Sequence, residues 1–279
     1  MASNTLFGQP FGIPTAASEQ MTNTSTIRSA SLMTTLTELK TGYRGFEWES
    51  ECWRKDSRRR SPYRVLVLFG LSPRTKDCLL VELCRRFFRR FPVSQELAKQ
   101  GEGFLKSVNA IVRQGQVPFV LSLARVLADQ GSVPRTAEDL LKINGVGQKV
   151  AECVLAYGWG IDALPLDANV QRVLNRIHGN EACPLASTGE LRELLKCLYQ
   201  EHRRDYDGLS ISMVDVHEIL RLHGQVCCTR KPDCAACPVS RCGSRLVGTD
   251  PARTNRTVPG IWDDWRELLL EPDGDRRSL

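Results

Sequence analysis

The stretch Ile143-Asn144-Gly145-Val146-Gly147-Gln148-Lys149-Val150-Ala151 decides how this chain is interpreted. Its two glycines allow the backbone to turn sharply just before a helix begins. Amide groups at such a turn can bind a phosphate without reading any base sequence. The stretch therefore predicts a hairpin between two helices, with Gly145, Val146 and Gly147 as candidate contacts to a DNA backbone, although short glycine hairpins often merely join helices.

Lys149 and Asp167 are the candidate catalytic pair. Lys149 falls in the first turn of an apolar helix expected over 148–158, so we expect its amine to lie at the partly desolvated wall of a pocket. Desolvation lowers the pKa of a lysine, which favours the neutral, nucleophilic amine. The plain alternative is a solvated lysine that binds phosphate. Asp167 interrupts an apolar run before the next helix, and its plain role is to cap that helix. A capping carboxylate is fixed in orientation, so it can also stabilise positive charge on a sugar or accept a proton.

Composition and charge restrict the class of protein. The chain has 279 residues, of which 42% are hydrophobic and 25% charged, as expected of a globular protein. Residues 54–92 hold twelve basic and three acidic side chains, so the net charge of this segment (12 − 3 = +9) exceeds the net charge of +6 of the whole chain. Such a concentration of positive charge favours a phosphate-binding surface. We see no membrane span and no secretory signal, so we expect an intracellular, DNA-associated protein. Residues 1–37 loosely resemble a transit peptide, which leaves organelle targeting as an alternative.

Eleven cysteines in a chain without a secretory signal indicate buried thiols or metal ligands rather than disulfides. We expect the following to lie in the core: Cys78, Cys84, Cys153 and Cys197. The candidate metal ligands are Cys227, Cys234, Cys237 and Cys242. Four thiolates within 16 residues can hold a [4Fe-4S] cluster or a zinc ion. Only one C-x2-C pair is present, whereas zinc ribbons generally use two, so the pattern favours an iron–sulfur cluster over zinc. Arg230 and Lys231 lie between the candidate ligands and are candidate phosphate contacts.

The periodicity predicts an all-α fold. A helix with an arginine stripe (Arg85, Arg86, Arg89, Arg90) is expected after Pro62. Further helices are expected at roughly 95–113, 118–130, 136–142, 148–158, 167–177, 188–202 and 210–223. We expect a disordered tail over 1–40, an aromatic and basic lead-in over 41–61, a catalytic domain over 62–245 and an extension over 246–279. His217 and His223 are interpreted as structural or phosphate-facing rather than as ligands.

The run Ile143 to Leu155, with Leu166-Asp167 and Cys227-x6-Cys234-x2-Cys237, resembles the helix-hairpin-helix DNA glycosylase superfamily. The resemblance is greatest to its iron–sulfur branch of endonuclease III and the mismatch glycosylases, and it covers about residues 62–245. It implies two helical domains with double-stranded DNA between them, a [4Fe-4S] cluster on the four cysteines, and a monomer. It also implies that Lys149 forms a Schiff base and that Asp167 assists.

Departures from that pattern concern the choice of substrate. Arg74 stands where relatives insert a glutamine into the base stack, and Asn144 stands where a hairpin proline is usual. The run Asp167-Ala168-Asn169 is more similar to the mismatch glycosylases, and Cys237-x4-Cys242 is one residue short. We expect a base-excision-repair glycosylase with apurinic/apyrimidinic lyase activity on oxidised pyrimidines. The alternatives are a thymine/uracil mismatch glycosylase and a DNA-binding module without catalysis.

Overall fold

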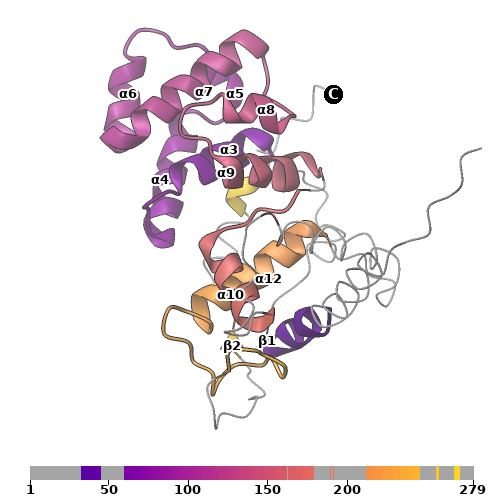
Figure 1. Cartoon of the computed structure of the whole chain (residues 1–279). Coiled ribbons are helices and arrows are strands. Elements are labelled where there is room, and N and C mark those ends of the chain that lie inside the picture. Colours follow the sequence, from indigo (N-terminus) through magenta and orange to yellow (C-terminus); the bar gives the residue numbers. More distant parts are fainter. Residues whose placement is uncertain are drawn as a thin grey trace, which may run out of the picture.

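The computed structural model describes residues 33–44, 60–161, 163–178, 189, 191, 212–245, 256–257 and 267–270. The helix expected over 188–202 lies almost wholly outside these ranges, and Cys197 lies outside them. The described helices gather in two bodies, one above the other in Figure 1. Each body has its own apolar core. The predicted all-helical, two-part fold is confirmed, and the only strands in the described ranges are two short ones.

The first body contains α3 to α9, coloured from purple to magenta in Figure 1. In chain order its elements are α3 (Pro62–Leu71), α4 (Asp77–Arg90), α5 (Ser94–Ala98), α6 (Phe104–Ile111), η1 (Gln114–Gln116), α7 (Val117–Gln130), α8 (Ala137–Leu141), α9 (Gln148–Cys153) and η2 (Val154–Gly158). Helix α3 is apolar on all sides and is buried from Val65 to Leu71. A helix without a polar face can only be stable inside a core, so α3 forms the centre of this body.

Helix α4 carries the predicted arginine stripe. Its buried face repeats every three or four residues, from Leu80 to Phe88, and the four arginines are exposed on the opposite face. Cys78, which was expected in the core, is exposed instead, and so is the neighbouring Leu79. Both lie in the first turn of α4, where the neighbouring Asp77 contacts polar Gln225 of another helix. The helical period of α4 therefore agrees with the prediction, but its buried face begins at Leu80 rather than at Cys78.

The helix expected over 95–113 is divided into α5 and α6. Gln100 and Gly103 adopt positive φ angles of 40° and 75° between them. A left-handed backbone ends a helix, and Gly103 then stands immediately before α6. The helix expected over 148–158 is present as α9, but its last five residues widen into the π-helix η2.

The second body contains α10 (Ala168–His178), α12 (Met213–Val226) and the cysteine loop 227–245. The axes of α10 and α12 approach closely because Gly224 has no side chain. A Cβ atom there would lie 2.8 Å from the Cβ of Asn169. Every residue from Met213 to Gly224 is buried, since α12 contributes to both apolar cores. Helix α12 is thus the element that joins the two bodies.

Both ends of the chain contribute to the cores in the described residues. Residues 33–42 form a helix, and Leu36, Leu39 and Tyr43 are buried in the second body. The expectation of disorder up to residue 40 is therefore wrong for residues 33–40. Leu36 and Leu39 lie on one face of this helix, Tyr43 follows it in the chain, and their burial anchors the segment on the core. The remaining boundaries of the proposed domains stay predictions.

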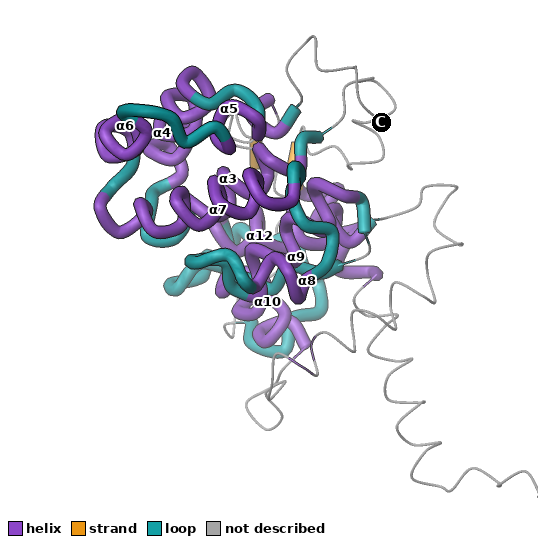
Figure 2. Tube along the Cα trace, turned by 90° about the horizontal axis from the view of Figure 1, so that it is seen from above, coloured by secondary structure: helices purple, strands orange, loops and turns teal. Residues whose placement is uncertain are grey.

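The expected C-terminal extension also packs on the core where it is described. Leu268 and Leu269 join the apolar core of the first body, and the Leu269 carbonyl accepts a 2.8 Å hydrogen bond from the Ser61 amide. Strand β1 (Tyr43–Arg44) pairs in parallel with β2 (Arg256–Thr257). Figure 2 shows that helices and loops make up nearly all the rest of the described backbone. None of the described helices combines the length and the apolar character needed to cross a membrane.

Candidate functional site

The glycine hairpin is a tight turn between α8 and α9. Gly145 has φ of 85°, and the Val146 amide donates to the Ile143 carbonyl at 3.0 Å. Glycine is the residue that adopts such a φ without strain. Gly145 and Gly147 are exposed, whereas the Val146 side chain is buried and its amide is already used. The expected phosphate contact at this hairpin is therefore restricted to the two glycines, and it stays a prediction.

Lys149 lies against an apolar wall, as the sequence suggested. Its side chain is half-buried, and its Nζ atom lies 4.6 Å from the ring centroid of Phe69, which is a cation–π contact. The Phe69 ring packs against the ring of Tyr157 at 5.4 Å between centroids. Helix α3 thus provides a rigid surface that limits where the Lys149 amine can point.

Asp167 caps α10 with one carboxylate oxygen and faces α12 with the other. Its Oδ1 atom accepts hydrogen bonds from the amides of Asn169 at 2.8 Å and Val170 at 2.9 Å. The predicted cap is confirmed. Its Oδ2 atom lies 3.6 Å from Arg221 Nε and 4.0 Å from His217 Nε2. The capping bonds fix the orientation of the carboxylate, so Oδ2 is held toward α12.

Asp167 and His217 have shifted pKa values with different causes. Burial opposes ionisation of Asp167, but the Val170 amide that donates to it and the positive charges of Arg221 and Lys149 favour the carboxylate, and the pKa of Asp167 is lowered. Complete burial lowers the pKa of His217 to about 3. His217 is therefore neutral near pH 7. The charge of Lys149 is one of the influences that lower the pKa of Asp167, and the role of these two residues as a catalytic pair stays a prediction.

Tyr157 orients the neutral His217 ring. The Tyr157 hydroxyl lies 2.6 Å from Nδ1 of His217, and both groups are buried. A neutral ring that accepts this hydroxyl at Nδ1 carries its proton on Nε2, which is the assignment the hydrogen-bond geometry favours. Nε2 has no hydrogen-bond partner among the described residues. Its N–H therefore points toward Asp167 from a distance that is just too long for a direct bond.

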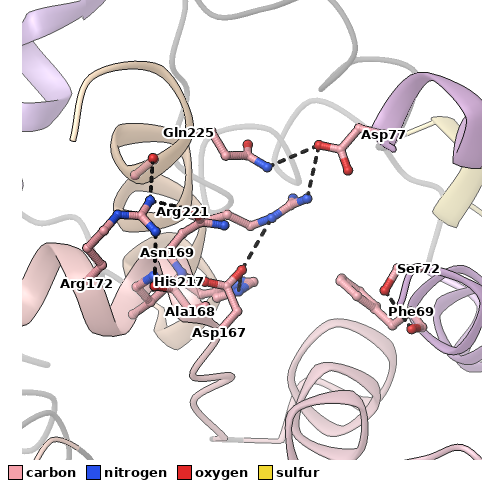
Figure 3. A network of polar contacts seen from close by, with 12 residues as sticks. Phe69, Ser72, Asp77, Asp167, Ala168, Asn169, Arg172, His217, Arg221 and Gln225 are labelled. Carbon is pink, nitrogen blue, oxygen red and sulfur yellow. Dashed lines mark hydrogen bonds and ion pairs between the residues drawn. The ribbon is translucent and has the colours of Figure 1, made fainter. Parts of the chain in front are cut away.

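Three residues of this site were missed in the sequence: Asp77, Arg221 and Gln225. Figure 3 shows Arg221 between the two aspartates. Arg221 Nη2 lies 3.5 Å from Asp77 Oδ2, and Gln225 Nε2 donates to the same oxygen at 3.1 Å. The sequence did contain a signal for Arg221 and Gln225, because polar side chains recur every fourth residue at 217, 221 and 225. That spacing places them on one face of a helix.

Arg74 is exposed on the turn between α3 and α4. It has φ of 59°, which is uncommon for a residue with a side chain. Neighbouring groups brace the turn: Arg113 Nη1 donates to the Arg74 carbonyl at 3.3 Å, and Gln116 Nε2 donates to the Leu71 carbonyl at 2.8 Å. The turn is thus fixed at its backbone while the Arg74 side chain stays accessible. Its contact with DNA stays a prediction.

The cysteine loop contains a compact group of soft ligands. The ligand atoms of His223, Cys227 and Cys237 all lie within 4.8 Å of one another, and all three residues are buried. Cys234 and Cys242 are half-buried and lie outside this group. Cys242 Sγ donates instead to the Arg176 carbonyl at 3.3 Å. Of the four predicted ligands, the structure brings two together directly.

Of the two roles expected for His223, the structural one fits its burial, whereas the phosphate-facing one does not. It is buried, with Nε2 3.7 Å from Cys237 Sγ and Nδ1 2.7 Å from the Tyr43 hydroxyl. The sequence could not show this contact because Tyr43 lies 180 positions before His223, at the start of β1. A hydroxyl on the second ring nitrogen is the usual way to orient an imidazole toward a metal.

The donor set fits a soft metal group. A hydrogen bond with Cys227, aided by His223, lowers the pKa of Cys237 to about 4 despite burial, so this thiol is ionised. Thiolates and imidazole are the ligands that iron–sulfur clusters and zinc take. The residues present are therefore compatible with either group.

Basic side chains hold the cysteine loop and extend from it. Arg176 of α10 donates to the carbonyl of Arg230 at 3.2 Å, and Arg245 donates to the carbonyl of Cys234 at 2.8 Å. The side chains of Arg230 and Lys231 are exposed. The loop thus has a fixed backbone with two accessible cations, which is the geometry expected of a phosphate contact.

Known proteins resemble this chain in sequence and in fold. Residues 130–157 match the family model described as helix-hairpin-helix motif. Endonuclease III of Thermotoga maritima is 30% identical over 181 residues, which cover 63% of this chain and 79% of that protein. The thymine/uracil-DNA glycosylase of Methanothermobacter thermautotrophicus is 28% identical over 226 residues, covering 77% and 92%. The structure of a thermostable thymine-DNA glycosylase aligns with a TM-score of 0.60 and 25% identity over 80% of this chain and 98% of that chain.

Proposed function

We infer the reaction of this protein from its kinship: the chain belongs to the helix-hairpin-helix DNA glycosylase superfamily and is endonuclease III-like. It is a base-excision DNA glycosylase. We propose that it also has apurinic/apyrimidinic lyase activity and acts on oxidised pyrimidines. The observation that supports this proposal most is the half-buried Lys149 amine against Phe69, whose charge helps to lower the pKa of the capping carboxylate of Asp167.

Lys149 is the proposed nucleophile. After the damaged nucleotide leaves the base stack, Nζ bonds to C1′ of the sugar while the bond from C1′ to the base breaks. The base departs with that electron pair and takes up a proton. Opening of the C1′–O4′ bond leaves an imine between C1′ and Nζ. Loss of a C2′ proton then expels the 3′ phosphate by breaking the C3′–O3′ bond, which cuts the strand.

Asp167 is the proposed electrostatic partner of that attack. Its lowered pKa keeps the carboxylate ionised near pH 7, where it can stabilise positive charge on C1′ as the base departs. The capping bonds from Asn169 and Val170 prevent the carboxylate from rotating away. Asp167 can also accept the proton that Nζ loses on forming the new bond.

The proposed DNA contacts surround this pair. Gly145 and Gly147 would bind one phosphate, Arg74 would approach the base stack, and Arg230 and Lys231 would bind phosphates nearby. Cys227, Cys234, Cys237 and Cys242 are the proposed ligands of a [4Fe-4S] cluster, with zinc as the alternative. When bound, the metal group would crosslink the loop that carries Arg230 and Lys231. The protein is proposed to act as a monomer inside the cell.

A thymine/uracil mismatch glycosylase is the second candidate. The thymine/uracil-DNA glycosylase relative aligns with more of this chain than endonuclease III of Thermotoga maritima does. The run Asp167-Ala168-Asn169 supports the same alternative. This candidate requires strong dependence on guanine opposite the target, and weak lyase action.

Borohydride trapping tests the proposed reaction. Purified protein is incubated with duplexes that contain an abasic site, thymine glycol, uracil opposite guanine or thymine opposite guanine, with Lys149→Gln and Asp167→Asn alongside. We expect a covalent adduct with wild-type protein on the abasic and thymine glycol duplexes. Lys149→Gln should lose the adduct while retaining affinity for DNA, and Asp167→Asn should slow base release by at least about a hundredfold, as expected when a charged group at the reacting atoms is lost.

Other outcomes separate the alternatives. Base release on the two mismatch duplexes without any adduct would favour the mismatch glycosylase. Tight binding of the abasic duplex with no product on any duplex would leave a DNA-binding module. Equal loss of affinity in both variants would contradict the assigned roles of Lys149 and Asp167, because binding alone does not require this pair.

A further inference from the structure

Arg221 lies between two carboxylates that come from different bodies of the molecule. Its guanidinium is 3.6 Å from Oδ2 of Asp167 in the second body and 3.5 Å from Oδ2 of Asp77 in the first (Figure 3). The Arg221 side chain is only 10% exposed. A guanidinium stays charged at all ordinary pH values, so a buried one requires anionic partners. Arg221 has two.

The partner in the first body holds Arg221 in place. Asp77 is the first residue of α4, where the helix N-terminus favours a carboxylate. Gln225 follows Arg221 by one turn of α12 and also donates to Asp77, at 3.1 Å. Two neighbouring side chains of α12 therefore share one carboxylate. This arrangement fixes the guanidinium from the side opposite to Asp167.

Arg221 is the permanent cation at Asp167 among the described neighbours. The titratable groups that face this carboxylate are Lys149 and Cys153 from α9 and His217 and Arg221 from α12. Burial raises the pKa of Cys153 to about 12 and lowers that of His217 to about 3, so both are neutral near pH 7. Lys149 must itself be neutral when it acts as a nucleophile. At that moment Arg221 supplies the positive charge that Asp167 needs.

We propose that Arg221 is a positioning residue of the site: anchored by Asp77 and Gln225, it keeps the Asp167 carboxylate ionised and oriented while Lys149 is neutral. This inference rests on the proposed roles of Lys149 and Asp167. In this proposal, the contact between α4 and α12 serves to hold Arg221 at the site. The site is complete only when the two bodies are joined through this ion pair.

Variants of Arg221 test the proposal through the pH dependence of adduct formation on the abasic duplex. Arg221→Gln should move the acid limb of the profile to higher pH and lower the rate at pH 7 about tenfold, equivalent to about 1.4 kcal/mol. Its affinity for the duplex should stay within about threefold of wild type. Arg221→Lys should restore the acid limb because it retains the charge. Arg125→Gln, which changes an exposed arginine on α7, is the matched control and should behave as wild type.

A measurement without substrate separates this inference from the proposed function. NMR of protein carrying 13C-labelled aspartate, with the Asp167 resonance assigned through Asp167→Asn, reports the titration of this carboxyl in the free protein. We expect Asp167 to titrate at higher pH in Arg221→Gln than in wild type or Arg221→Lys. If wild type gives no product on any duplex, the proposed function fails, yet the titration still decides the role of Arg221.

Two results would overturn the proposal. The first is an unchanged Asp167 titration in Arg221→Gln. The second is a parallel loss of folding or DNA affinity in both Arg221→Gln and Arg221→Lys, because that would make Arg221 a structural or DNA-contacting residue.

Discussion

Buried polar side chains on α12 face both the candidate catalytic site at Asp167 and the candidate metal site at Cys237. Asp215, His217, Glu218, Arg221 and His223 are all buried. Burial of charged or titratable groups costs free energy unless each has partners. His217 and Arg221 face Asp167, and His223 faces Cys237. This concentration makes α12 the element where single substitutions should affect chemistry most.

His217 should make the stability of the protein depend on pH. Its pKa is lowered to about 3 by burial, whereas an unfolded histidine titrates near about 6.5. Between these values the unfolded state binds a proton that the folded state does not. The free energy of unfolding should therefore fall as pH decreases below about 6.5, by on the order of 1 kcal/mol per pH unit. Urea unfolding at pH 7 and pH 5.5 measures this loss.

His217→Gln should reduce that loss, because glutamine does not titrate and can still accept a hydrogen bond from Tyr157. Tyr157→Phe is the matched control, since it removes the hydroxyl and leaves the buried imidazole in place. It should retain the pH dependence of wild type. An identical loss in wild type and His217→Gln would show that His217 is protonated in the folded protein and would contradict its assigned neutral state.

The hairpin between α8 and α9 offers two glycines with different constraints. Gly145 has φ of 85°, and a Cβ atom there would lie 3.2 Å from the Cβ of Phe119. Gly147 has φ of −98°, and a Cβ atom there would meet nothing within 4 Å. Gly145 is thus needed for the turn itself, while the space beside Gly147 is open.

Alanine substitutions should separate these roles. Gly145→Ala should lower the free energy of unfolding by about 1 kcal/mol or more, because alanine is strained at this φ. Gly147→Ala should leave it within about 0.5 kcal/mol of wild type, yet weaken binding to an abasic duplex because its methyl group would stand where a phosphate must approach. Urea unfolding and fluorescence anisotropy measure the two effects. Unchanged DNA affinity in Gly147→Ala would argue against the hairpin as a phosphate site.

The proposed metal centre would connect the N-terminal segment, α12 and the cysteine loop within the second body. Tyr43 contacts His223, and His223 faces Cys237 across the group of soft ligands. Metal binding to such a group contributes directly to folding free energy. The second body should therefore depend on a bound metal more than the first does, because the first has the larger of the two apolar cores.

Loss of the metal should destabilise the second body and weaken DNA binding. We expect the purified protein to contain iron and sulfide, and Cys237→Ser to lose both, to melt at lower temperature and to bind DNA less tightly. Cys78→Ser changes an exposed cysteine and should match wild type in all three measurements. Zinc without iron would replace the iron–sulfur assignment, and a protein without metal that is equally stable would contradict a metal centre altogether.

The local features of this protein could be predicted from its sequence. The helical period of α4, the turn at Gly145, the placement of Lys149 on a helix and the cap at Asp167 each depend on residues within a few positions of one another. Helix periodicity, glycine backbone freedom and capping are short-range effects, so they can be recognised directly in the sequence.

Tertiary structure decided which side chains meet across the molecule. The sequence showed Lys149 and Asp167, but not that Arg221 would contact Asp77, or that the Gln225 amide would donate to Asp77 from 148 positions away. It also did not show that Tyr43 would contact His223, 180 positions away. Contacts of this kind depend on how whole helices pack, and packing is set by the shape of two cores rather than by any local pattern. For that reason the two proposed catalytic residues were visible in the sequence, whereas their supporting residues became visible only in the fold.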